Sequence, residues 1–309
     1  MPLDPQCQVI VDATNAAGVP FETQDYPEIR KGYEASTDFF SHPTPTLDSV
    51  ANLMFAGPET NLPVRLYRPR REGNEALPTL VFYHGGGWVV GNPDTHDHVC
   101  RYLAARSQCL IASVDYRLAP EHPFPAAFDD AVAGVRWVQR KADEIGADAD
   151  RIAVGGDSAG GNLAAAAALA VRGEIDLRGQ LLIYPAVDFT ADNDSLRDNG
   201  SGYSLTSAAM ARFMNWYLPS PDLASDWRAS PQHATDHSGL PPTLIQSAEF
   251  DPLRDEADDY GKTLQAAGVD VDYHCHTGMI HGFARMGSKV DGAFLALDEA
   301  VEFLKRVFA

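Results

Sequence analysis

Short apolar runs alternate with longer helical ones through the middle of the chain. Such alternation predicts an α/β fold with a mostly parallel, doubly wound sheet. The expected strands are residues 65–67, 79–83, 110–115, 152–155, 180–184, 243–248 and 269–273. The expected helices are residues 98–108, 126–145, 160–172, 252–267 and 292–307.

Two segments fall outside this alternation. Residues 1 to about 45 precede the first expected strand, and residues from about 188 to 228 interrupt the succession of strands. We therefore expect one α/β domain over residues 46–309 that carries an insertion at about 188–228, with an N-terminal segment, 1–45, in front of it. From periodicity alone, both segments are also compatible with peripheral helices that only cover the core.

A serine in a glycine-rich bend is the first candidate for chemistry. The string Gly156-Asp157-Ser158-Ala159-Gly160 lies between an expected strand and an alanine-rich helix. Glycines on both sides remove the Cβ atoms that would clash where a strand turns directly into a helix, so the Ser158 hydroxyl projects from the turn. The pattern predicts a nucleophile, although phosphate-binding loops and ordinary strand-helix turns share it.

Three consecutive glycines follow an earlier apolar strand. The run Leu80 to Tyr83 ends in His84-Gly85-Gly86-Gly87, about seventy residues before the serine. A loop without side chains lets backbone N–H groups come within about 2.7–3.1 Å of a developing oxyanion. We expect Gly85 and Gly86 to be donors, with the N–H of Ala159 as the third. A flexible loop or a β-bulge is the structural alternative.

An acidic stretch follows the strand expected at 243–248. It offers Glu249, Asp251, Asp255 and Glu256. Because Pro252 suits the first turn of a helix, Asp251 is expected at the strand tip as the N-cap, with the two later acids on the helix. We therefore expect Asp251 to be the acid that orients the catalytic base.

Three histidines compete for the role of that base. The alternating segment 269–276 predicts a strand with His274 and His276 on one face, typical of a half-exposed pair on an edge. His281 instead lies in a loop expected over residues 278–283, where it has freedom to reach a serine. We expect His281 to be the base, which gives the chain order Ser, Asp, His known for serine hydrolases on an α/β sheet.

Composition narrows the other possibilities. The 309-residue chain has a formal net charge of −19, which disfavours nucleic acid and anionic membranes as partners. Because there is no apolar run of about 18 residues and no basic-then-apolar leader, we expect a cytoplasmic protein without stable membrane insertion. A homodimer is compatible with the sequence.

Cysteine and histidine spacing gives no indication of a metal site. The four cysteines show no Cys-x-x-Cys spacing, so we expect free thiols. His96-Asp97-His98 and His274-Cys275-His276 each lack the second cluster of ligands that a metal site needs. We expect neither a metal nor another cofactor.

Together these strings resemble the bacterial relatives of mammalian hormone-sensitive lipase, which are carboxylesterases of the α/β-hydrolase superfamily. The resemblance extends from Leu3-Asp4-Pro5 almost to the C-terminus. It implies the α/β-hydrolase fold, the triad Ser158, Asp251 and His281, structural roles for His84 and Tyr116-Arg117, and a helical cap formed by residues 1–45 and about 188–228. The strings that carry it are His84 to Gly87, Asp115 to Ala127, Gly156 to Gly161, Asp251 to Glu256 and His281 to Phe283.

The expected function is hydrolysis of small esters with short- to medium-chain acyl groups through an acyl-enzyme. The resemblance favours short chains because caps of this family leave confined pockets. Two alternatives stay open: a lactonase or peptidase on the same fold, and a non-catalytic binding module like the plant gibberellin receptors, against which His281 argues. Pocket candidates, each equally typical of a core, are Trp88, Tyr184, Phe213, Trp216 and Phe283.

Overall fold

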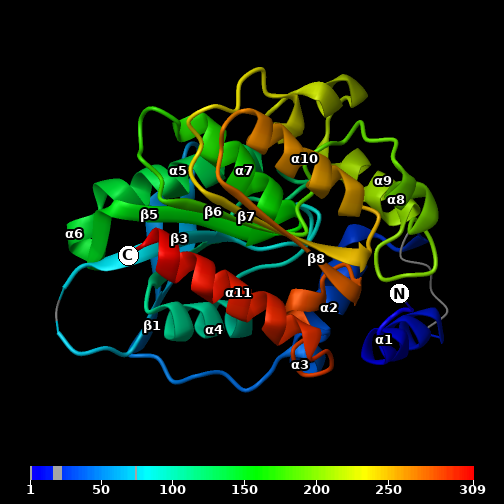
Figure 1. Cartoon of the computed structure of the whole chain (residues 1–309), viewed down its shortest axis with the longest axis horizontal. Helices are drawn as coiled ribbons and strands as arrows, with labels where there is room; N and C mark the ends of the chain where they lie inside the picture. The colour runs from blue at the N-terminus through cyan, green and yellow to red at the C-terminus, as the bar shows by residue number, and fades with distance from the viewer. Residues whose placement is uncertain (1, 17–22, 74) are drawn as a thin grey trace.

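A computed structural model describes residues 2–16, 23–73 and 75–309 of the chain. Its strands are β1 Ser49–Ala56, β2 Asn61–Arg68, β3 Leu77–Tyr83, β4 Leu110–Val114, β5 Ala147–Asp157, β6 Gly179–Ile183, β7 Thr243–Phe250 and β8 Val271–Ile280. Within these residues they form one sheet in the order β1-β2-β4-β3-β5-β6-β7-β8 (Figure 1). β2 is antiparallel to β1 and β4, and the other neighbours are parallel, as the alternation predicts.

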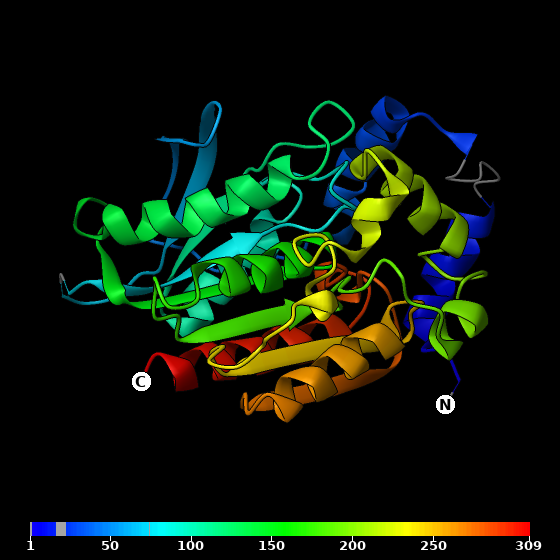
Figure 2. The same ribbon diagram turned by 90° about the horizontal axis from the view of Figure 1, so that it is seen from above.

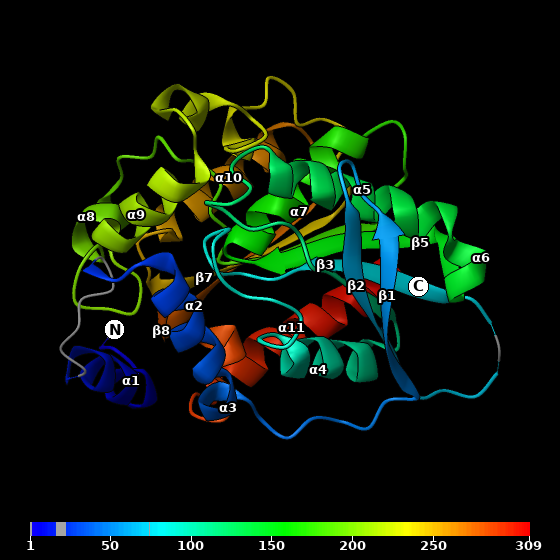
Figure 3. The same ribbon diagram turned by 180° about the vertical axis from the view of Figure 1, so that it is seen from behind.

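Helices cover both faces of the sheet. One face carries α5 Ala126–Arg140, α7 Ala159–Val171 and α10 Arg254–Ala266, and the other carries α4 Asp97–Ser107 and α11 Gly292–Val307 (Figures 1 and 3). This confirms the expected α/β architecture. The remaining segments are α1 Pro5–Ala16, α2 Tyr26–Ala35, α3 Thr37–Phe40, α6 Ala142–Ile145, α8 Asp194–Asp198 and α9 Ser207–Tyr217, with the 3₁₀ turns η2 Pro221–Ser225, η3 Pro231–His233 and η4 Phe283–Arg285.

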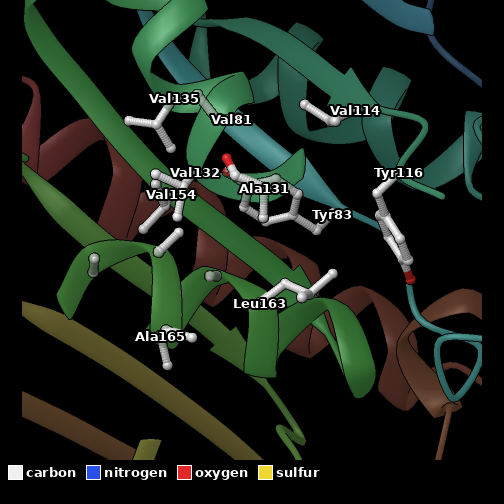
Figure 4. Close-up of a cluster of buried hydrophobic side chains, with 14 of the residues drawn as sticks. Val81, Tyr83, Val114, Tyr116, Ala131, Val132, Val135, Val154, Leu163 and Ala165 are labelled. Atoms are coloured by element: carbon white, nitrogen blue, oxygen red, sulfur yellow. The ribbon is translucent and has the colours of Figure 1, made fainter. Parts of the chain in front are cut away.

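The sheet separates two hydrophobic clusters. Because successive strand residues point to opposite faces, Val81 of β3 belongs to the cluster beneath α5 and α7, whereas Phe82 belongs to the cluster beneath α4 and α11. Figure 4 shows part of the first cluster, with Val132 of α5 beside Val154 of β5, and with Leu163 of α7 in the same cluster. Burial on both faces explains why the central strands are continuous apolar runs rather than alternating ones.

Two elements differ from the sequence-based expectation. β1 is not predicted by the pattern of apolar residues, because most of its side chains are exposed to solvent. The side chain of Met54, for example, is 59% exposed. It exists through backbone pairing with β2 in a hairpin, closed where the N–H of Gly57 donates to the carbonyl of Thr60. The single helix expected over 126–145 is two helices, since α5 ends at Arg140 and α6 begins at Ala142.

Helices α1, α2, α8 and α9 gather at the end of the molecule where the parallel strands finish (Figures 1 and 2). α2 and α9 contact each other directly. The rings of Tyr26 and Trp216 meet edge to face at 6.1 Å, and Arg212 donates to the carbonyl of Gln24 at 2.9 Å. Parts of residues 1–45 and of residues 188–228, the two segments outside the strand-helix alternation, therefore lie over the strand ends. The domain boundary at residue 45 stays a prediction.

Candidate active site

Ser158 occupies the sharp turn between β5 and α7. Its backbone has φ 55° and ψ −119°, a conformation that residues with side chains rarely adopt. The flanking glycines make the turn possible: a Cβ atom on Gly160 would lie 1.9 Å from the carbonyl oxygen of Tyr83, and one on Gly156 would lie 2.3 Å from the same oxygen. The glycine pattern therefore reflects the close crossing of this turn and the end of β3.

The three residues expected to form a triad lie in mutual contact. The Nε2 atom of His281 is 2.9 Å from the Oγ atom of Ser158, and its Nδ1 atom is 2.7 Å from an Asp251 carboxylate oxygen. The Asp251 side chain is fully buried and also accepts the N–H of Leu253 at 2.9 Å. Because β5, β7 and β8 run parallel in one sheet, with only β6 between β5 and β7, their carboxyl ends bring the three residues to one edge.

The local setting of Asp251 and His281 corrects two expectations. α10 begins at Arg254 with Leu253 as its N-cap, so Asp251 lies in the turn before the helix and is not the N-cap. β8 continues to Ile280, so His281 directly follows a strand and residues 278–280 are not a loop. Strand pairing with β7 extends β8 further than its sequence suggests, since Phe250 still pairs with Ile280 beyond a bulge.

The competing acids and histidines have other partners. Glu249 accepts the N–H of Gly278 at 2.8 Å. His274 and His276 both face Glu299, at 3.0 and 3.3 Å, on the edge strand β8. His276 is buried with 6% exposure, because α11 covers that face of the strand, so the pair is not half-exposed throughout. Asp255 and Glu256 lie on α10, as expected.

The first glycine of the loop after β3 is already hydrogen-bonded. The N–H of Gly85 donates to the Asp157 carboxylate at 2.8 Å, and the Nε2 atom of His96 lies 3.2 Å from the same carboxylate. Burial opposes ionisation of Asp157, but attraction from His96 and these hydrogen bonds outweigh it and hold the pKa of the carboxyl below its ordinary value. Of the two loop N–H groups expected to face a substrate, that of Gly85 is therefore already donated to a buried carboxylate.

The next two glycines are placed differently. Gly86 and Gly87 line the cavity that contains Ser158. Within the described part of the chain, their N–H groups and that of Ala159 have no hydrogen-bond acceptor. A Cβ atom on Gly86 would lie 2.1 Å from the carbonyl oxygen of Val90, so only glycine fits there. These three N–H groups are free to bind an oxygen atom.

His84 and Tyr116 support the loop from behind. The Tyr116 hydroxyl donates to the carbonyl of His84 at 2.7 Å, and the two rings stack at 4.4 Å. Burial, together with the neighbouring His96, lowers the pKa of His84 to about 3, so its imidazole is neutral. Arg117 binds Asp130 at the base of the following turn.

Comparison with known proteins identifies the family. A family model described as alpha/beta hydrolase fold matches residues 80–285. The chain belongs to this family. It is 40% identical, over 98% of its length, to a carboxylic ester hydrolase of Mycobacterium tuberculosis, of which it covers 82%. It is 36% identical to an ethyl acetate hydrolase of Pseudomonas putida, with 96% of each chain covered.

Solved structures of similar sequence have the same fold as this α/β-hydrolase. A hyperthermophilic esterase from the archaeon Pyrobaculum calidifontis matches with a TM-score of 0.94 and 40% identity, covering 99% of each chain. An α/β-hydrolase enzyme from the metagenome of Lake Arreo, Spain, matches with a TM-score of 0.95 and 42% identity, covering 99% of this chain and 98% of the other. The fold and the resemblance to carboxylesterases are confirmed.

A cavity of about 450 Å³ in the hydrolase contains Ser158 and His281 in its wall. Of the five expected pocket residues, Trp88 and Phe213 line it. Trp88 has a φ of 61° and stacks on Tyr217 at 4.5 Å, which fixes its indole ring. Further wall residues that the sequence did not single out are Tyr33, Leu205, Met210, Met214, Glu256 and Arg285.

The other three expected pocket residues lie outside the described lining of the hydrolase cavity. Tyr184 packs against the ring of His281 at 4.8 Å, and Phe283 packs against Tyr184 at 5.7 Å. Both are buried and form the support behind the triad. Trp216 packs against α2 rather than into the cavity. All three are aromatic side chains, and only their direction in the fold separates them from the lining residues.

The histidines and cysteines considered for metal binding have other surroundings. His98 contacts the backbone carbonyl of Arg285 at 2.9 Å. Across residues 2–16, 23–73 and 75–309, no group of three or more His, Cys, Asp or Glu is placed to hold a metal ion. Cys7, Cys100 and Cys109 are buried, Cys275 is exposed, and all four are free thiols. None of the helices in these residues has the length and apolar character needed to cross a membrane.

Proposed function

We propose that Ser158, His281 and Asp251 hydrolyse carboxylic esters through an acyl-enzyme. The protein is a carboxylesterase of the α/β-hydrolase family. One observation supports this assignment of residues most strongly. The Ser158 hydroxyl contacts His281, which in turn contacts the buried carboxylate of Asp251. A serine with a base at 2.9 Å, itself oriented by an acid, meets the geometric requirement for an activated nucleophile.

In the proposed mechanism, the Nε2 atom of His281 takes the proton of Ser158 as the hydroxyl oxygen attacks the ester carbonyl. Asp251 keeps the Nδ1 proton of His281 in place and stabilises the imidazolium that forms. His281 then protonates the leaving alcohol, which leaves the acyl group on the Ser158 oxygen. Water deprotonated by His281 attacks this acyl-enzyme and releases the acid. These steps need no cofactor.

The oxyanion donors are assigned to Gly86, Gly87 and Ala159. This changes the expectation from the sequence, because the N–H of Gly85 is donated to Asp157. Gly86 and Gly87 both line the cavity next to Ser158, and Ala159 begins α7, whose N-terminal N–H groups favour negative charge. Two loop donors and one helix donor together surround the position where the tetrahedral oxygen develops.

The substrates are small esters with short- to medium-chain acyl groups. A mostly apolar cavity of about 450 Å³ accommodates acyl chains of roughly two to eight carbons. The similar Pseudomonas putida protein is named for ethyl acetate, the ester of a two-carbon acid, which supports this size range. A cytoplasmic location and a homodimer stay predictions from the sequence.

Serine replacement combined with covalent trapping tests the proposed function. Ser158→Ala should fold like the wild type but lose turnover of p-nitrophenyl butyrate by roughly a millionfold. Mass spectrometry after treatment with a phosphonate ester should locate one adduct on the Ser158 peptide of the wild type and none on the variant. Ser113→Ala, at a buried serine of β4, is the matched control and should keep wild-type turnover. Residual turnover close to wild type in Ser158→Ala would show that another residue is the nucleophile.

A further inference from the structure

Arg285 is a buried cation in the wall of the active-site cavity. It lies in η4, four residues after His281, and has 5% exposure. Its Nε and Nη2 atoms are buried and have no hydrogen-bond partner among the described residues. It forms no ion pair with a carboxylate in that part of the chain, unlike the buried Arg117, which binds Asp130.

Aromatic rings hold the Arg285 side chain in place. Its Cζ atom lies 4.1 Å from the centre of the Tyr33 ring and 5.7 Å from the centre of the Phe40 ring. Its backbone carbonyl is fixed by His98. A guanidinium group stacks on rings through its flat faces, whereas its N–H groups point outward in its own plane. These contacts therefore position the group without using its hydrogen-bond donors.

The unused donors of Arg285 call for an anionic acceptor. A guanidinium group is always charged, and a buried charge without a hydrogen-bonded partner is costly. The nearby carboxylate of Asp157 is occupied by Gly85 and His96. Two N–H groups in one plane match the two oxygen atoms of a carboxylate, which gives the strongest pairing available to arginine.

We propose that Arg285 forms a carboxylate subsite of the cavity, so that the enzyme hydrolyses half esters, in which a free carboxylate sits at the far end of the acyl chain from the ester. This rests on the proposed function, because Ser158 attacks the ester end while Arg285 holds the carboxylate. Arg285 is the only arginine or lysine among the described lining residues. Asp188, in the same wall, disfavours a substrate carboxylate at its own position in the cavity.

Half esters and their neutral diesters distinguish this subsite from the general esterase activity. The substrates are the monoethyl and diethyl esters of malonic, succinic, glutaric and adipic acid, with ethyl butyrate as a neutral reference, measured by acid release at constant pH. We expect at least one half ester to match or exceed its diester in kcat/KM. In Arg285→Gln, kcat/KM for that half ester should fall roughly 10- to 100-fold more than for its diester, mainly through KM.

Two further variants separate charge, shape and distance. Arg285→Lys keeps the charge but loses the planar pair of donors, so the half-ester preference should fall less than in Arg285→Gln. If Arg285→Gln does not fold, Arg285→Lys provides the test, and an unchanged preference in it overturns the proposal. Arg106→Gln is the control, because Arg106 is a cation of α4 outside the described lining, and it should leave the preference unchanged.

Failure of the proposed esterase function and failure of the carboxylate subsite give different results in these assays. If the wild type hydrolyses neither ethyl butyrate nor any diester, the proposed function is wrong. If it hydrolyses these neutral esters, but every half ester is at least about tenfold poorer and Arg285→Gln leaves the ratio unchanged, the carboxylate subsite is wrong. Free glutarate tests the other source of a carboxylate: Arg285-dependent competitive inhibition without half-ester turnover would assign the site to released acid and overturn the substrate proposal.

Discussion

Asp157 links the serine turn to the glycine loop. It directly precedes Ser158, and its carboxylate accepts the N–H of Gly85. A Cβ atom on Gly85 would lie 2.4 Å from an Asp157 carboxylate oxygen, so residue 85 must be glycine for this contact to form. His96 completes the carboxylate's hydrogen bonding from the start of α4. The same acid that fixes the loop therefore leaves Gly86 and Gly87 as the donors that face a substrate.

The role of Asp251 as the acid that orients His281 can be tested against that of Glu249, the nearest competing acid. Asp251→Asn keeps the shape of the side chain but favours the wrong tautomer of His281, so kcat for ethyl butyrate should fall by about four orders of magnitude. Glu249→Gln should cost less than about tenfold, because glutamine still accepts the N–H of Gly278. Steady-state kinetics of both purified variants measure this difference. Equal losses would mean that the contact between His281 and Asp251 is not the one used in catalysis.

Helix α2 depends on one arginine for its position. Ile29 is its only buried residue in the described structure. Arg30 donates to the carbonyls of Val89 and Ala119 at 2.7 and 2.9 Å and binds both oxygens of Glu121. Since Val89 is hydrogen-bonded to the carbonyl of Gly86, these contacts join α2 to the glycine loop. The polar contacts of Arg30 thus add to the aromatic contacts of Tyr26 and Tyr33 in holding a helix that forms part of the cavity wall.

Removing Arg30 should therefore change selectivity more than stability. In Arg30→Ala, looser docking of α2 should raise KM for short esters several-fold and move the preferred acyl chain toward longer substrates. The ion pair is partly exposed, so the free energy of unfolding should fall by only about 1 kcal/mol. Lys31→Ala, on the exposed side of the same helix, is the control. Activity across p-nitrophenyl esters from acetate to palmitate measures the profile, and identical profiles for both variants would contradict this role of α2.

A buried acid makes the stability of the whole molecule depend on pH. Glu256 of α10 accepts the N–H of Val187 at 2.7 Å, and burial raises its pKa from 4.5 to about 8. Between these two values the folded protein retains a proton that the unfolded chain releases. The contribution of Glu256 to stability is therefore complete below about pH 4.5, decreases as the pH rises, and is lost once the pH passes about 8.

Glu256→Gln should remove this dependence while keeping the hydrogen bond to Val187. From pH 5 to pH 8, the free energy of unfolding of the wild type should fall relative to that of the variant by about 3 kcal/mol. Urea unfolding at pH 5, 6.5 and 8 measures it. Glu302→Gln replaces an exposed carboxylate of α11 and should follow the wild type at each pH. Parallel curves for wild type and Glu256→Gln would contradict the assignment of this proton.

Features that depend on residues close together in the chain could be predicted from the sequence. Apolar runs and their spacing predicted the parallel sheet and its main helices, because burial on both faces of a strand requires continuous apolar residues. The glycines around Ser158 predicted a sharp turn, because the steric reason for them lies within a few residues. The order of Ser158, Asp251 and His281 after successive strands also indicated which residues would meet, and their distances agree with it.

Features that depend on contacts between distant segments could not be predicted from the sequence and become visible in the fold. The N–H of Gly85 is taken, unlike that of Gly86, by a carboxylate 72 residues away in the chain. Phe213 enters the cavity and Trp216 does not, because α9 packs against α2 with one side only. β1 forms through pairing rather than through its own pattern. That Arg285 has no hydrogen-bond partner for two of its donors among the described residues is likewise a property of the fold, because a buried charge becomes informative only when its surroundings are known.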